Sequence, residues 1–398
     1  MKGWLPPLEI IKTFVLLYTH SIKFSGILIT NEQKEKVLNI ALGKDLEYLF
    51  IFSLVLILPK ILLRFRLPSG ITALIIGIAF SVFDPNLKSE TIFKFLSQIG
   101  ITSLFLFAGL EVEVKELKRD FPYLKKYLLK FLIVLLLITI CFHTWMDLSL
   151  PNSLIFALGI FTPSAGFILT SLHSFDTNID QDHWIKSKAI SKEVLSIILL
   201  FIALQGNDIK ALGISLIFFT ALYLVLPWIF KMFFKFISPY APNSEISFLV
   251  VLSLTAGIIS KEIGAYYLVG AFVVGLIGSR FKNEIFKDGE AILFRSLSNF
   301  FTVFLPFYFF SAGLKLTVTG FNLDALGVGL FMVIIFVPLR MALVVTSVRY
   351  FLKNTLLKGY KISLSLIPTL IFGLVIASVL LERNEVDKTL VYALIVYT

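Results

Sequence analysis

The stretch LFAGLE at residues 106–111 recurs as FSAGLK at residues 310–315. Each copy closes the third apolar run in a block of six such runs. Two runs further on, the first block contains Thr162-Pro163 and the second contains Pro368-Thr369 at nearly the same offset. These matched motifs predict that the chain contains two copies of one structural unit.

The composition surrounding these motifs is that of a membrane protein. Of the 398 residues, 57% are hydrophobic and only 16% are charged, with a mean hydropathy of +0.90. A typical soluble domain is about 45–50% apolar and about 25% charged. A soluble fold would have to expose much of this excess and would aggregate. The composition therefore excludes a soluble enzyme, a nucleic-acid-binding factor and a disordered chain.

The chain contains about thirteen apolar runs, each bounded by charged or proline residues. We expect all of them to be helices, because an open sheet cannot satisfy its backbone in lipid. The predicted fold class is therefore an all-α polytopic membrane protein with about thirteen transmembrane helices. The runs lie at 46–63, 70–84, 92–111, 127–146, 151–172, 187–206, 211–237, 245–260, 263–280, 296–316, 324–348, 362–381 and 388–398. Because the last run is short, either the final helix is short or the chain stops within it.

The two copies predict an internal division of the chain. We expect a first repeat at 46–207, a linking helix at 208–240 and a second repeat at 241–398, preceded by an interfacial segment or a poor extra span at 1–45. An odd number of helices between the two starts inverts one repeat relative to the other. Inverted repeats with crossed, broken helices are typical of secondary transporters.

Basic residues are sorted by the side on which their loops are predicted to lie. Connections after odd-numbered runs contain 21 Lys and Arg residues, against 7 after even-numbered runs. The positive-inside rule places the basic side in the cytoplasm. We therefore expect a multi-pass protein of the bacterial inner membrane, with the first span starting outside and the C-terminus inside. The net charge of +10 then reflects cytoplasmic loops facing anionic lipid rather than nucleic acid.

The two proline motifs predict helix breaks within the membrane. Pro163 and Pro368 lack an N–H, so helix carbonyls lose their usual donor and a helix can open there. Together with the hydroxyls of Thr162, Ser164 and Thr369, such carbonyls could replace the water around a small cation. The alternative at either position is a simple proline kink.

Three charged residues lie within predicted spans, where a charge is a functional hypothesis by default. Lys192 and Glu193 precede the apolar run 194–204, and Arg340 lies within 331–347. Glu193 lies about 15 Å along its helix if the helix starts near 182, but only about 9 Å if it starts near 187. Arg340 needs a carboxylate or helix carbonyls, and Glu193 is the expected partner; a purely structural salt bridge is the alternative.

Other chemical groups give little signal. Cys141 has no partner cysteine, and the four histidines show no metal-ligand spacing, so we expect no cofactor and no resident metal. Glu111, Glu113 and Lys315 follow the Ala-Gly-Leu motifs, and we expect them to cap helices at the membrane interface. A polytopic membrane enzyme is a weaker hypothesis, because no His/Asp/Ser constellation is apparent. A buried Glu193, in contrast, suits ion exchange, since it can bind a proton or a cation but not both.

Several segments resemble the monovalent cation:proton antiporters, in the branch with bacterial Na⁺/H⁺ exchangers and glutathione-gated K⁺ efflux transporters. The resemblance is carried by 104–113, 264–275 and 306–314, and it covers the chain from about residue 46. It implies a homodimer in which a mobile core bundle carries ions. It matches Thr162-Pro163 to the first broken helix and Arg340 to a core basic residue.

The resemblance also shows two departures. Lys192-Glu193 stands where the family has Asn, Asp or Gln followed by an ion-binding Asp. A lysine beside the cation site could repel the ion by several kcal/mol at short range and low effective dielectric. The leading hypothesis is exchange of H⁺ for Na⁺ or K⁺ through Glu193, by alternating access across the bilayer. The alternative is a transport-inactive, channel-like or sensor-like relative in which Lys192 disturbs the site.

Overall fold

The computed structural model describes residues 44–65, 67–112, 114–165, 168, 179–205, 209–241, 244–263, 267–285, 290–352 and 356–398. Every regular element within these ranges is a helix. The first part of the chain forms α3 (Lys44–Leu62), α4 (Ser69–Phe83), α5 (Thr91–Leu110), α6 (Val114–Trp145), α7 (Leu150–Phe161), α9 (Ile179–Gln205) and α10 (Ile209–Met232), the last continued by a π-helical segment at Phe233–Ile237.

The second part forms α11 (Glu245–Glu262), α12 (Tyr267–Gly278), α13 (Lys282–Ile285), α14 (Glu290–Leu314), α15 (Leu323–Leu352), α16 (Leu356–Ser365), α17 (Leu370–Arg383) and α18 (Lys388–Tyr397). Short 3₁₀ segments lie at Leu63–Phe65, Pro85–Ser89, Ser279–Phe281 and Val318–Gly320. Each predicted apolar run overlaps one of these helices, except that 362–381 is divided between α16 and α17. The run 151–172 extends beyond α7, and most of its last part lies outside the described residues. Most of the expected N-terminal segment 1–45 lies outside the described residues.

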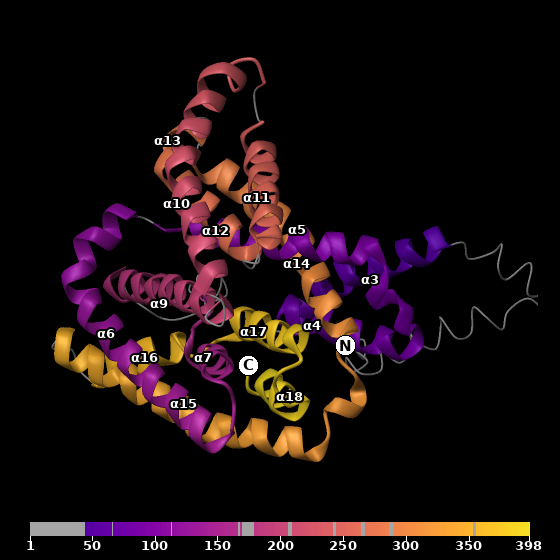
Figure 1. Ribbon diagram of the computed structural model, residues 1–398, viewed down its shortest axis with the longest axis vertical. Coiled ribbons are helices and arrows are strands. Elements are labelled where there is room, and N and C mark those ends of the chain that lie inside the picture. Colours follow the sequence, from indigo (N-terminus) through magenta and orange to yellow (C-terminus); the bar gives the residue numbers. More distant parts are fainter. Residues whose placement is uncertain are drawn as a thin grey trace, which may run out of the picture.

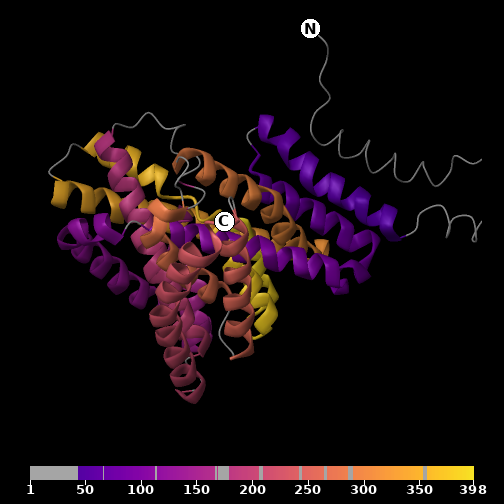
Figure 2. The same cartoon turned by 90° about the horizontal axis from the view of Figure 1, so that it is seen from above.

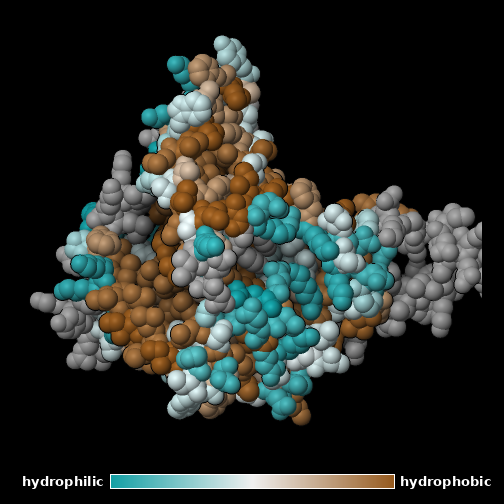
Figure 3. All heavy atoms as spheres, in the orientation of Figure 1, coloured by the Kyte–Doolittle hydropathy of each residue, from teal (hydrophilic) through white to brown (hydrophobic). Residues whose placement is uncertain are grey.

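The helices have the lengths and surfaces of a membrane protein. In the described ranges, five helices are long and apolar enough to cross a bilayer alone, and the bent pair α16–α17 makes a sixth. Figure 3 shows apolar residues covering much of the upper lobe, where α10 and α11 lie in Figure 1. On α10, Ile217, Leu224 and Trp228 are among the exposed apolar side chains. The prediction of an all-α polytopic membrane protein is confirmed.

Glycines bring two pairs of helices into close contact in the same way. A Cβ atom added at Gly77 on α4 would lie 2.9 Å from the Cα of Gly313 on α14. One added at Gly275 on α12 would lie 2.9 Å from the Cα of Gly109 on α5. Gly109 and Gly313 are the equivalent glycines of the two Ala-Gly-Leu motifs, so α5 meets α12 as α14 meets α4. This is the packing that two copies of one unit would produce; the repeat boundaries stay a prediction.

The two proline motifs break their helices and meet. α7 ends at Phe161, and Thr162 is extended, with φ −85° and ψ 120°. α16 and α17 are separated by the break around Pro368 and are bent by 43°. The Ser164 N–H donates a hydrogen bond to the Pro368 carbonyl at 2.9 Å, so the two breaks contact each other directly. Figures 1 and 2 place α7, α17 and α18 together near the middle of the molecule.

Candidate ion-binding site at the crossing of two broken helices

Lys192 and Glu193 lie well inside α9. The helix begins at Ile179, so Glu193 lies about 21 Å along it at 1.5 Å per residue. Both side chains are buried, with 9% and 8% of their surface exposed. The structure therefore supports the deeper of the two expected positions.

Glu193 faces a small cavity that also contains a second carboxylate. The cavity has room for about one water-sized group and is lined by Glu193 and Glu111 among apolar residues: Ala108, Ala165, Ile190, Val194 and Phe272. One Glu193 carboxylate oxygen accepts a hydrogen bond from the Ala165 N–H at 2.9 Å. Ala165 directly follows the first helix break, so the break supplies the amide that orients the carboxylate.

Glu111 is a site residue that the sequence reasoning missed. It is the C-cap of α5, which ends at Leu110, so it caps a helix as expected, but it also lines the same cavity as Glu193. Its counterpart in the second motif, Lys315, instead forms a partly exposed ion pair with Glu382 at 2.7 Å. The signal available in the sequence was the opposite charge of the two motif copies. Glu113 lies outside the described residues.

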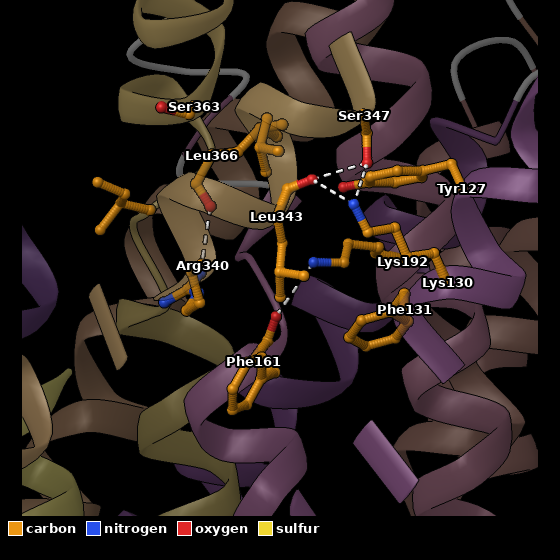
Figure 4. Close-up of a pocket in the computed structure, with 12 residues that line it drawn as sticks. Tyr127, Lys130, Phe131, Phe161, Lys192, Arg340, Leu343, Ser347, Ser363 and Leu366 are labelled. Carbon is orange, nitrogen blue, oxygen red and sulfur yellow. Dashed lines mark hydrogen bonds between the residues drawn. The ribbon is translucent and has the colours of Figure 1, made fainter. Parts of the chain in front are cut away.

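Lys192 faces a different cavity on another side of α9 (Figure 4). Its ammonium group donates to the Phe161 carbonyl at 3.4 Å, at the C-terminal end of α7. It also lies 4.3 Å from the ring centre of Phe131 and 5.7 Å from that of Tyr127. The C-terminal end of a helix is negative, and aromatic faces attract cations. The lysine is therefore stabilised by neutral groups with negative partial charge.

Arg340 does not form the expected ion pair with Glu193. Its guanidinium group donates to the Leu366 carbonyl at 3.1 Å and to the Tyr397 hydroxyl at 3.0 Å. That hydroxyl in turn donates to the Ile160 carbonyl at 3.1 Å. Of the two expected kinds of partner, the carbonyl is the one observed, because the break after α16 leaves the Leu366 carbonyl within reach of Arg340. The choice of Glu193 was wrong, because Glu193 faces another cavity.

The predicted hydroxyl ligands are buried at the crossing but do not line the Glu193 cavity. The Thr162 hydroxyl donates to the Ser196 hydroxyl at 2.8 Å. The Ser164 hydroxyl is buried without a hydrogen-bond partner among the described residues, and Thr369 is buried immediately before α17. Pro163 and Pro368 form the breaks themselves. What the crossing brings together directly is the Glu193 carboxylate and the amide of Ala165.

The arrangement provides two carboxylates in an apolar enclosure, without a basic side chain among the described residues that line it. A carboxylate in such an enclosure favours a proton or a cation, because an isolated buried negative charge is costly. The described residues contain no group of three His, Cys, Asp or Glu side chains that could hold a metal ion as a metal centre does.

Comparison with known proteins assigns the chain to a family. The model of the transmembrane part of sodium/hydrogen exchangers matches residues 49–398. The chain belongs to the sodium/hydrogen exchanger family. The resemblance to cation:proton antiporters in the sequence is thereby confirmed, and the family is one of transporters.

Relatives of this exchanger cover most of its length. The probable Na⁺/H⁺ antiporter GerT of Bacillus cereus is 25% identical over 308 residues, which is 68% of this chain and 75% of GerT. Probable Na⁺/H⁺ antiporter 3 of Methanocaldococcus jannaschii is 25% identical over 341 residues, 80% of this chain and 86% of that protein. The structure of the sodium proton antiporter MjNhaP1 from the same archaeon at pH 8 matches with a TM-score of 0.57 and 15% identity. It covers 87% of this exchanger and 91% of MjNhaP1, and it shows that the fold is shared.

Proposed function

We propose that this exchanger carries Na⁺ and H⁺ in opposite directions, with Glu193 binding one or the other. The observation that carries the proposal is the pair of carboxylates, Glu193 and Glu111, in an apolar cavity beside the crossed helix breaks. The family and the names of the relatives support Na⁺ as the cation. K⁺ is the comparison ion, because nothing in a carboxylate cavity by itself excludes it.

In the proposed mechanism, cation and proton compete for Glu193. The Ala165 amide holds one carboxylate oxygen in place, and Glu111 adds a second negative charge toward the ion. Three hydroxyls are proposed as further ligands. That of Ser164, which has no partner among the described residues, belongs to the residue directly before Ala165. Those of Thr162 and Thr369 contribute when the helix breaks rearrange. Because one carboxylate cannot hold both ions, release of one accompanies binding of the other, and this couples the two flows.

Lys192 and Arg340 have a supporting role in this proposal. Each donates to a carbonyl at the end of a broken helix: Lys192 to that of Phe161, the last residue of α7, and Arg340 to that of Leu366, which directly follows α16. They thus occupy the negative ends of the half-helices, which leaves the Glu193 cavity as the site for the moving ion. We further propose alternating access in a homodimer in the inner membrane, with the sidedness given by the positive-inside count.

Reconstitution into proteoliposomes tests the proposal. An imposed Na⁺ or K⁺ gradient should drive proton movement, reported by a pH-sensitive dye inside the vesicles. We expect Glu193→Gln to reduce the exchange rate at least about 100-fold, because the amide cannot take up a proton or pair with a cation. The matched control is Glu382→Gln at the surface, which should exchange at the wild-type rate. Wild-type exchange in Glu193→Gln would refute the site.

A transport-inactive or sensor-like role is the second candidate, and one observation favours it. Lys192 places a cation next in sequence to the carboxylate, although its side chain faces a different cavity. If wild-type protein shows no exchange and Lys192→Asn gains it, the chain is a disabled exchanger. Exchange by wild-type protein removes this candidate.

A further inference from the structure

The cavity on the Lys192 side of α9 contains three basic side chains and has no assigned role. Lys130, Lys192 and Arg340 line it together with Tyr127 and Ser347, and no carboxylate is among its described lining residues. We propose that this cavity is a binding site for one small monovalent anion, of which chloride is the commonest. Figure 4 shows the ends of Lys130 and Lys192 and the Tyr127 hydroxyl in this region.

The positive charge of the residues that line this cavity favours an anion. The Lys130 ammonium group bonds only to neutral oxygens in the described residues: the Leu343 carbonyl at 3.4 Å, the Thr346 hydroxyl at 2.7 Å and the Ser347 hydroxyl at 3.4 Å. Lys192 and Arg340 likewise bond to neutral oxygens. Three cations around one cavity repel each other. Lys192 and Arg340 are buried whereas Lys130 is partly exposed, and buried charges are normally paired. An anion would provide the missing counter-charge.

The cavity also contains a hydrogen-bond donor, the Tyr127 hydroxyl, that no described residue uses. Tyr127 is 5% exposed and lines the cavity, yet its hydroxyl has no hydrogen-bond partner in the part of the chain that the structure describes. Buried polar groups almost always have a partner, so an exception needs an explanation. Figure 4 shows this hydroxyl on the same side of the cavity as the Lys130 ammonium group. A bound anion would accept from both.

The size of the cavity and its apolar walls favour a small ion. The free space inside the walls holds about one or two water-sized groups, which fits a chloride ion and excludes a large ligand. The remaining walls are mostly apolar, including Phe131, Phe161 and Val344. Such walls suit a weakly hydrated ion with a single charge. A phosphate group, with four oxygens around its phosphorus, is larger than the one or two water-sized groups that this space holds.

A consequence for transport follows, and it rests on the proposed function. A chloride ion beside Lys192 would offset the positive field that this lysine projects toward Glu193. Cation binding in the neighbouring cavity would then be stronger with the anion present. The anion would act as an activator that is not itself transported.

Anion binding is testable without transport. The purified full-length chain is unfolded thermally in choline chloride and in choline gluconate at equal ionic strength, without Na⁺ or K⁺. We expect a saturable rise in Tm with chloride, because a ligand that binds only the folded state stabilises it. Tyr127→Phe and Lys130→Gln should each raise the half-saturating chloride concentration about tenfold or more, the effect of one lost hydrogen bond to a charged group.

Lys125→Gln is the matched control, since Lys125 is exposed on the same helix and is not among the cavity's lining residues. It should respond to chloride as the wild type does. A chloride response that is absent in the wild type, or equal in all four proteins, overturns the site. Na⁺/H⁺ exchange measured with sodium chloride and with sodium gluconate then tests the consequence separately. If Tm shows binding but chloride leaves exchange unchanged, the activator role is wrong while the site stands. If no exchange occurs in either sodium salt, the proposed function has failed and the anion site has not.

Discussion

The two cavities flanking α9 differ in sign although they are built on consecutive residues. Successive helical residues point about 100° apart, so Glu193 and Lys192 face different neighbours. One break in α7 serves both: the Phe161 carbonyl before it accepts from Lys192, and the Ala165 amide after it donates to Glu193. The broken helix thus has two polar ends, and a side chain of opposite sign faces each end.

Reversing the charge at one end should have the largest effect on stability. In Lys192→Glu, a carboxylate would face the Phe161 carbonyl and the ring faces of Tyr127 and Phe131. We expect a loss of about 3–5 kcal/mol, the cost of an uncompensated buried charge. Lys192→Met should cost much less, because an apolar side chain of similar volume leaves no charge behind. Unfolding by denaturant measures both, and equal costs would contradict this view of the lysine.

Removing the second carboxylate should weaken the negative cavity without abolishing it. In Glu111→Gln, the cation keeps Glu193 but loses one attractive charge. We expect the half-saturating Na⁺ concentration for exchange to rise about tenfold, equivalent to about 1.4 kcal/mol. Glu262→Gln, on the exposed end of α11, is the control. An unchanged Na⁺ dependence in Glu111→Gln would show that Glu111 does not act on the ion.

Neutralising Lys192 should raise the affinity of the neighbouring carboxylate cavity for Na⁺. Lys192→Asn removes the positive field beside Glu193, so the Na⁺ affinity for exchange should rise about two- to fivefold, as expected for a partly screened charge. The chloride response of Tm should weaken in the same variant, because one cation of the anion site is gone. A fall in Na⁺ affinity would contradict the repulsion on which this prediction rests.

A surface carboxylate provides the smallest effect and a baseline for the buried ones. Hydrogen bonds from Asn152 at 3.0 Å and then from Arg383 hold the pKa of Glu385 below its ordinary value. Its stabilising contribution is therefore full above the unfolded-state pKa of about 4.3 and is lost as the pH falls through the lower folded value. Glu385→Gln should cost about 1 kcal/mol or less at pH 7, and almost nothing at pH 3. A larger cost at pH 3 than at pH 7 would reverse the assigned sign.

Patterns that repeat over many residues were predictable from the sequence. Hydrophobic runs fixed the positions of the helices, and the prolines indicated both breaks, because a missing N–H acts locally. The partners of the buried charges were not predictable. Arg340 reaches the Leu366 carbonyl and Tyr397 rather than Glu193, since side-chain direction depends on how distant helices are rotated. Glu111 was missed for the same reason: its place in the Glu193 cavity depends on how helices distant in the sequence are arranged.

Proton release on cation binding tests competition at Glu193 most directly. Purified protein in weakly buffered solution near neutral pH is mixed with NaCl, and the pH is followed with an indicator dye. We predict that Na⁺ releases protons from the wild-type protein, up to about one per saturated site, and that choline chloride does not. Glu193→Gln should release none, whereas Glu382→Gln should match the wild type. Na⁺ binding without proton release, or undiminished release from Glu193→Gln, would contradict the competition at Glu193.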